Sequence, residues 1–209
     1  MKKIAIIGAG PMGLACALEL LKSGHSVDLY EADDRVGGMT AHFDFNGLSI
    51  ERYYHFICMP DQPMFDVLAE LNISDKLHWR ATKMGYYYNG KLYDWGNPIA
   101  LLKFTPLSFF NRLRYGLHMF YCTKIKDGSA LDSQEASNWI KSWIGQRAYN
   151  VLWKKLFTLK FHKFTDNLSA SWIWARIRRV GTSRKNLFTE QLGYLEGGSE
   201  TLLKGVSCR

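Results

Sequence analysis

Cysteines are few in this 209-residue chain, and long apolar runs are absent. The cysteines, which form no Cys-x-x-Cys pair, are Cys16, Cys58, Cys122 and Cys208. This spacing argues against a zinc ribbon and a disulfide-rich secreted scaffold, and it fits a reducing compartment. No apolar run reaches about 18 residues without glycine, proline or charge, so the sequence predicts no standard spanning helix. We therefore expect a cytoplasmic protein without a metal site.

Acidic residues are scarce in the second part of the chain. Residues 1–78 hold 6 Lys+Arg and 11 Asp+Glu, which gives a net charge of −5. Residues 79–209 hold 21 Lys+Arg and 8 Asp+Glu, which gives a net charge of +13. All seven tryptophans lie between Trp79 and Trp174. Such a shift in composition predicts structural regions that meet near residue 78. We place the regions at 1–78, 79–187 and 188–209.

The first forty residues have the pattern of a β-α-β unit. Lys3–Gly8 is typical of a buried strand, a Gly-x-Gly-x-x-Gly turn follows, and Leu14, Ala17, Leu18 and Leu21 have helical spacing. Ser26–Tyr30 is predicted as the second strand. In such a unit the glycines permit a tight turn and close approach of a pyrophosphate, and the strand-end acid accepts from ribose. The turn comprises Gly8, Gly10, Pro11, Met12 and Gly13, and the acid is Glu31.

The residues that follow Glu31 narrow the choice of cofactor. Arg35-Val36-Gly37-Gly38 completes a signature that resembles the flavin-dependent amine oxidase superfamily, which includes monoamine oxidases, protoporphyrinogen oxidases and phytoene desaturases. The resemblance covers Ile4–Thr40 closely and implies FAD rather than NAD in a Rossmann-type α/β fold. The cofactor-binding residues that it implies are Gly8, Gly10, Pro11, Met12, Gly13, Glu31, Ala32, Arg35, Gly37, Gly38, Met39 and Thr40.

Two Asn-Gly pairs predict β-hairpins. One hairpin joins Phe43–Phe45 to Leu48–Ile50, and the other joins Tyr86–Tyr88 to Leu92–Trp95. In the resembled family the segment after the first hairpin approaches the flavin. The residues of that segment that we select as candidates for the substrate cavity are Tyr53, Tyr54 and His55.

Residues 79–187 are predicted to form a mostly helical α+β substrate region. Pro98–Phe104, Pro106–Cys122 and Ser171–Val180 have helical patterns, and Ser133 is a candidate cap for a helix that Gly145 ends. The excess of cations fits an anionic substrate or a membrane surface, and some members of the resembled family handle lipid-soluble substrates. Of these interpretations we favour a helical domain with an aromatic core and a solvated basic face. No nucleic-acid motif accompanies the charge, so we expect no nucleic-acid partner.

Residues 187–209 resemble the stretch of protoporphyrinogen oxidase-like proteins that returns to the FAD domain. Members of the family are about twice as long, so we expect an incomplete FAD domain in a partial chain. The expected partners also include the inner face of a membrane, through peripheral contact, and a C-terminal half that is needed for a complete FAD site.

The resemblance implies an FAD-dependent oxidoreductase that transfers hydride from a small-molecule substrate to flavin. No residue stands out as a general base, so the catalytic residues are unassigned. Two alternatives remain open: a flavoenzyme similar to UDP-galactopyranose mutase, and an inactive truncated remnant.

Overall fold

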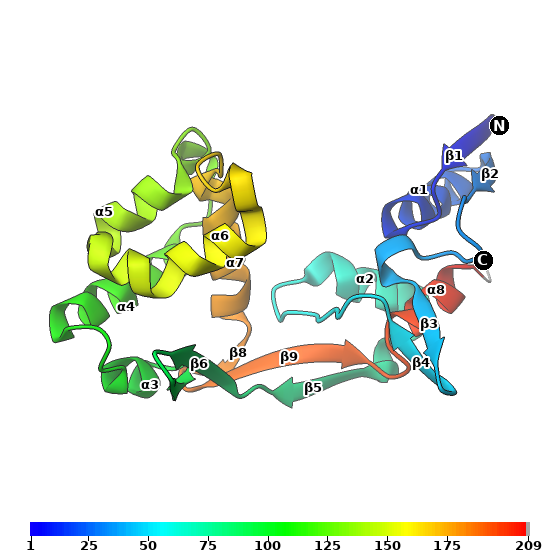
Figure 1. Ribbon diagram of the computed structural model, residues 1–209. Coiled ribbons are helices and arrows are strands. Elements are labelled where there is room, and N and C mark those ends of the chain that lie inside the picture. The colour runs from blue at the N-terminus through cyan, green and yellow to red at the C-terminus, as the bar shows by residue number, and fades with distance from the viewer. Residues whose placement is uncertain (208–209) are drawn as a thin grey trace. The chain divides into compact units, whose positions relative to one another are not determined.

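The computed structural model describes residues 1–207 and divides into two compact units. Unit 1 comprises residues 1–57, 61–80 and 193–209, and unit 2 comprises residues 58–60 and 81–192. Unit 1 is therefore discontinuous in sequence, because most of unit 2 is inserted between its second and third segments. Figure 1 labels the elements of each unit.

Unit 1 contains a parallel strand pair, a hairpin and three α-helices. β1 and β2 pair in parallel register, with Ala5 opposite Asp28, and α1 joins them. This confirms the predicted β-α-β unit. The bounds are β1 (Lys3–Ile7), α1 (Pro11–Lys22), β2 (Ser26–Tyr30), η1 (Gly38–Thr40), β3 (His42–Phe45), β4 (Leu48–Glu51), α2 (Gln62–Glu70), η2 (Ser74–Lys76) and α8 (Ser199–Ser207).

A three-stranded sheet of order β5-β9-β8 contains two points at which the chain passes from one unit to the other. β5 spans Leu77–Ala81, β8 spans Arg184–Asn186 and β9 spans Thr189–Leu195. The predicted strand over Glu190–Leu195 is confirmed within β9.

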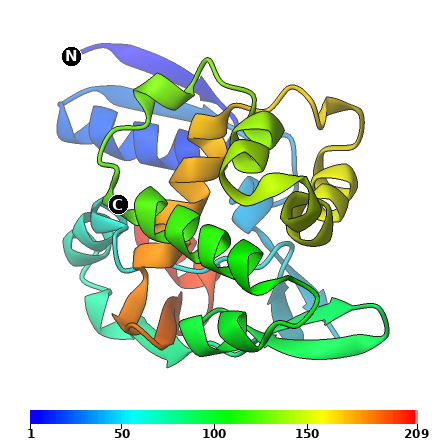
Figure 2. The same cartoon turned by 90° about the vertical axis from the view of Figure 1, so that its left-hand side faces the viewer.

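Unit 2 is mostly helical, as predicted. In Figures 1 and 2, α4 and α7 lie side by side, and both pack against α5. The bounds are β6 (Met84–Tyr88), β7 (Lys91–Trp95), α3 (Pro98–Lys103), α4 (Phe109–Lys124), η3 (Ser129–Leu131), α5 (Ala136–Tyr149), η4 (Asn150–Lys154, a π-helix), α6 (Lys155–Phe161), η5 (His162–Phe164) and α7 (Ala170–Thr182).

Both predicted hairpins form with the expected register. Phe43 pairs with Ile50 in β3–β4, and Tyr86 pairs with Tyr93 in β6–β7. At both turns the Asn and the Gly have positive φ, which is the geometry that suits the twist of two-residue hairpins.

Aromatic and aliphatic side chains together form the core of unit 2. Phe104, Ile140, Ile144 and Phe157 are each at most 1% exposed, and the rings of Tyr86, Tyr93 and Trp95 pack around Phe104. These buried side chains therefore serve packing.

The predicted start of the α5 helix was wrong. Glu135, not Ser133, is the N-cap, and its carboxylate accepts from the backbone N–H groups of Ser137 and Asn138. This carboxylate satisfies two of the free N–H groups of the first turn, which leaves no such role for the earlier serine. Gly145 interrupts the helical geometry with φ of 80°, but helical structure resumes after it.

Candidate functional site

The N-terminus of α1 carries backbone N–H groups that point out of the helix. Gly10 is the N-cap in an extended conformation, Pro11 occupies the first turn, and no side chain caps the helix. The first intrahelical bond is donated by the Leu14 N–H to the Gly10 carbonyl at 3.0 Å. Within residues 1–207, the N–H groups of Met12 and Gly13 have no hydrogen-bond acceptor. These groups and the helix dipole favour an anion.

Gly13 is required because the helix passes very close to the preceding turn. A Cβ at Gly13 would lie 1.9 Å from the carbonyl oxygen of Gly8. No side chain fits there without moving the strand-to-helix turn.

The second glycine motif lies directly against the first. The Gly37 N–H donates to the Ala9 carbonyl at 2.8 Å. A Cβ at Gly38, which has φ of +52°, would lie 3.2 Å from Gly10 Cα. Two motifs separated by more than twenty residues therefore bring their backbones together at Gly10 and Gly38, and we call the combined surface of Gly8–Gly13 and Gly37–Thr40 the glycine cradle. Within it Met39 is 65% exposed.

Glu31 lies beside the glycine cradle at the end of β2. Its Oε1 accepts from the Asp33 N–H at 2.9 Å, and its Oε2 accepts from the Ala9 N–H at 2.7 Å. These two bonds lower the pKa of the carboxyl group. The carboxylate is therefore fixed and ionised at neutral pH, and each oxygen retains a lone pair for a further donor. Ala32, the next residue, is exposed.

Arg35 has partners of its own within unit 1. Its guanidinium donates from Nε and Nη2 to the Asp34 carboxylate at 2.6 and 2.8 Å, and from Nη1 to the His42 carbonyl at 2.8 Å. The pair with Asp34 raises the pKa of Arg35 and lowers that of Asp34. Arg35 also lines a cavity of about 490 Å³ with Phe43, Glu200 and other residues. A contact between Arg35 and phosphate stays a prediction.

Helix α8 supports the glycine cradle, a role that the sequence analysis missed. Ser199 donates from Oγ to the Thr40 carbonyl at 2.9 Å, and its N–H donates to Glu51 Oε1 at 2.6 Å. Leu203 packs with Ala9 and Leu14. Burial alone would raise the pKa of Glu51, but the bonds from Ser199 and from the His55 N–H lower it. The sequence Gly197-Gly198-Ser199, at the start of α8, was the signal from which this role could have been predicted.

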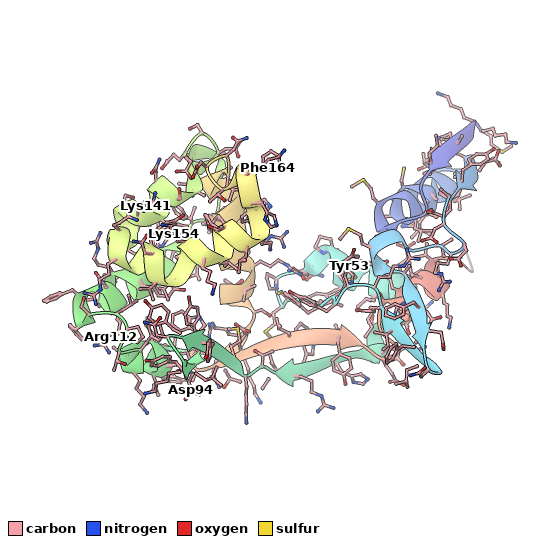
Figure 3. All side chains as sticks on the ribbon, viewed as in Figure 1. Tyr53, Asp94, Arg112, Lys141, Lys154 and Phe164 are labelled. Carbon is pink, nitrogen blue, oxygen red and sulfur yellow. The ribbon has the colours of Figure 1, made fainter. Side chains whose placement is uncertain are left out.

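The three candidates for the substrate cavity lie on the segment after β4. Tyr53, labelled in Figure 3, is 58% exposed and Tyr54 is 84% exposed. The His55 N–H donates to Glu51 Oε2 at 3.2 Å. These side chains do not line the cavity beside Arg35, nor a cavity of about 570 Å³ in unit 2. Their contact with substrate stays a prediction.

No group of three or more His, Cys, Asp or Glu side chains within residues 1–207 is arranged to hold a metal ion. No helix in this range combines the length and apolarity needed to cross a bilayer.

Solved structures that share the fold include oxidoreductases of about twice this length. An oxidoreductase from Methanosarcina mazei has a TM-score of 0.66 and 20% identity, over 100% of this chain and 48% of that chain. Putrescine oxidase has a TM-score of 0.66 and 18% identity, and the match covers 99% of this chain and 49% of that chain. These likenesses establish the fold.

Curated relatives are more similar in sequence. Zeta-carotene desaturase from Solanum lycopersicum is 41% identical over 192 residues, which is 80% of this chain and 32% of the relative. Protoporphyrinogen oxidase 2 from Arabidopsis thaliana is 28% identical over 158 residues, which is 72% of this chain and 31% of the relative. The chain thus spans about a third of the length of these relatives. Residues 13–206 match the flavin-containing amine oxidoreductases. This confirms the predicted resemblance: the chain belongs to the flavin-containing amine oxidoreductase family, and its cofactor is FAD.

Proposed function

We propose that the glycine cradle and Glu31 hold the adenosine diphosphate part of FAD. The diphosphate would accept from the N–H groups of Met12 and Gly13 at the start of α1. The ribose hydroxyls would donate to the Glu31 carboxylate, whose bonds to Ala9 and Asp33 keep it in place.

One observation carries this proposal: the close approach of Gly38 to Gly10. It leaves the backbone of Gly10 and Gly38 free of side chains beside a helix N-terminus, where a Cβ would otherwise block a phosphate. The residues present therefore fit the group.

Hydride transfer from a small apolar molecule is the activity that we propose for the whole protein. FAD, when bound, accepts the hydride at its flavin ring. The residues of the glycine cradle and Glu31 would bind and orient the cofactor, and they would take no part in proton transfer. The names of the desaturase relatives support a carbon–carbon bond as the site of oxidation.

Calorimetric titration with ADP and with FAD tests the cradle. ADP carries the diphosphate and the ribose without the flavin, so it probes these residues alone. Glu31→Gln keeps the size of the side chain and removes its charge, and we expect affinity for ADP to fall about tenfold. Asp28→Asn, a neutral substitution on the same strand, is the control and should leave the affinity unchanged. Failure of ADP to bind would refute the proposal.

We propose further that α3 and α4 rest on an anionic membrane surface. Apolar side chains that are each at least 49% exposed recur along these two helices at Ile99, Leu102, Phe109, Phe110, Leu113, Leu117 and Phe120. Residues 98–124 contain four Lys+Arg and no Asp or Glu. Of these cations, Arg112 is labelled on α4 in Figure 3. Exposed rings with cations and no acids suit an interface with anionic lipid.

Sedimentation with vesicles tests this second proposal. We expect binding to vesicles of phosphatidylcholine with phosphatidylglycerol, weaker binding to phosphatidylcholine alone, and release at high salt. The double substitution Phe109→Ser and Phe110→Ser should reduce binding. Phe164→Ser removes a ring that is 57% exposed outside these helices and serves as the control. Equal sedimentation of the two variants would contradict the assignment.

A further inference from the structure

Unit 2 encloses a cavity of about 570 Å³ that no residue of the glycine cradle enters. Its walls come mainly from β7, α3, α4 and α7, and apolar side chains such as Leu101, Met119, Ile177 and Val180 predominate. This volume lies within the range of sites that hold small molecules. The cavity borders the exposed ring of Phe120, so a molecule can reach it from the outer face of α4.

Two buried polar atoms of the cavity wall lack hydrogen-bond partners. Glu190 is 5% exposed; its Oε1 accepts from Thr82 Oγ1 at 2.8 Å, while its Oε2 is buried without a partner. The indole Nε1–H of Trp153 is also buried without a partner. Unpaired polar atoms in an apolar setting are costly, so each calls for a ligand group or a water.

The position of Trp153 supports a ligand. This residue lies in η4, the π-helical segment Asn150–Lys154 between α5 and α6. Single π-helical turns inside helices occur frequently at functional sites, because they are tolerated where they place a side chain that binds.

The charges of the wall limit the chemistry of the ligand. Arg184 lines the same cavity, and its guanidinium donates to the carbonyls of Gly181 and Gly96 at 3.1 and 3.0 Å. Arg184 lies opposite Glu190 in the β8–β9 pair, so the wall already holds one cationic side chain beside this carboxyl group, and an ammonium ligand would add a second cation to an apolar space. A hydroxyl group donates a hydrogen bond to a carboxyl oxygen and brings no charge of its own.

We propose that this cavity binds an apolar molecule that carries a hydroxyl group, which donates to Glu190 Oε2 while the molecule lies against the Trp153 indole. The identification of this molecule as the substrate of the enzyme rests on the proposed function. Binding itself requires only unit 2.

Titration without any flavin nucleotide separates this proposal from that of the FAD cradle. The ¹⁵N-labelled protein would be titrated with 1-decanol, with its methyl ether and with decylamine, while nuclear magnetic resonance follows the tryptophan indole N–H signals. Decanol should bind about tenfold more tightly than the ether, which lacks only the donor, and more tightly than the amine. The signal that Trp153→Phe removes should shift with decanol.

Substitutions in the wall complete the test. Glu190→Gln retains an oxygen for Thr82 but loses the charge, so affinity for decanol should fall about tenfold with little change for the ether. Asp94→Asn, which changes an exposed carboxylate of β7, is the control. Equal affinity for alcohol and ether, preference for the amine, an unmoved Trp153 signal or no binding would overturn the proposal, since water would then satisfy both atoms.

Discussion

Acid should destabilise this protein through His118 of α4. The His118 side chain is fully buried, with Trp139 at 4.6 Å in an edge contact and Trp143 stacked at 5.2 Å between ring centroids. Neither ring nitrogen has a partner within residues 1–207. Burial therefore lowers the pKa of His118 to about 4, from 6.5.

The size of the effect follows from proton linkage. Because the folded-state pKa is depressed, the folded protein keeps His118 neutral while the unfolded chain takes up a proton below pH 6.5. The free energy of unfolding is unaffected above that pH and falls as pH drops from 6.5 toward 4. Each pH unit costs up to about 1.4 kcal/mol, so the full loss is roughly 3 kcal/mol.

Urea unfolding followed by tryptophan fluorescence at several pH values between 7.5 and 4.5 measures this loss. His118→Phe keeps an aromatic ring and removes the titration, so its free energy of unfolding should depend less on pH in this window. His162→Asn changes an exposed histidine of the same unit and should behave as the wild type. Identical pH dependence of His118→Phe and wild type would refute the reasoning.

Three further predictions concern other parts of the chain. Gly13→Ala should lower the melting temperature by more than about 5 °C in circular dichroism, because its Cβ would meet a carbonyl oxygen at 1.9 Å. Iodoacetamide should label the exposed Cys16 but not Cys122 in mass spectrometry, since burial raises the pKa of the Cys122 thiol to about 12. Glu51→Ala should speed hydrogen exchange of the Ser199 amide, which loses its acceptor at 2.6 Å, and unchanged exchange would count against that bond.

Local features of the fold were predictable because neighbouring residues determine them. The β1-α1-β2 unit follows from apolar spacing around a glycine turn, and Asn46-Gly47 and Asn89-Gly90 specify hairpins by their positive φ. The start of α5 was not predictable from residue preference alone. Serine is the commoner cap, yet the longer side chain of Glu135 reaches two amides there.

The glycine cradle was predictable as two motifs but not as one surface. Contacts across about 160 residues hold it together, such as that from Ser199 to Thr40, and no local pattern encodes them. Arg35 shows the same limit, because its bonds to Asp34 and to the His42 carbonyl depend on how the chain folds back after β2. The exposure of Tyr54 likewise depends on packing around a loop rather than on its residue type.

The inserted position of unit 2 sets an order of events during synthesis. Ala9 and Leu14 leave the ribosome early, but Leu203, which packs against them, follows only after residues 81–192 have been made. At about 5–20 residues per second, those 112 residues take roughly 6 to 22 s. Unit 2 can fold in that interval, while the apolar side of the glycine cradle stays uncovered. The part of the molecule that is translated first is therefore among the last to be completed.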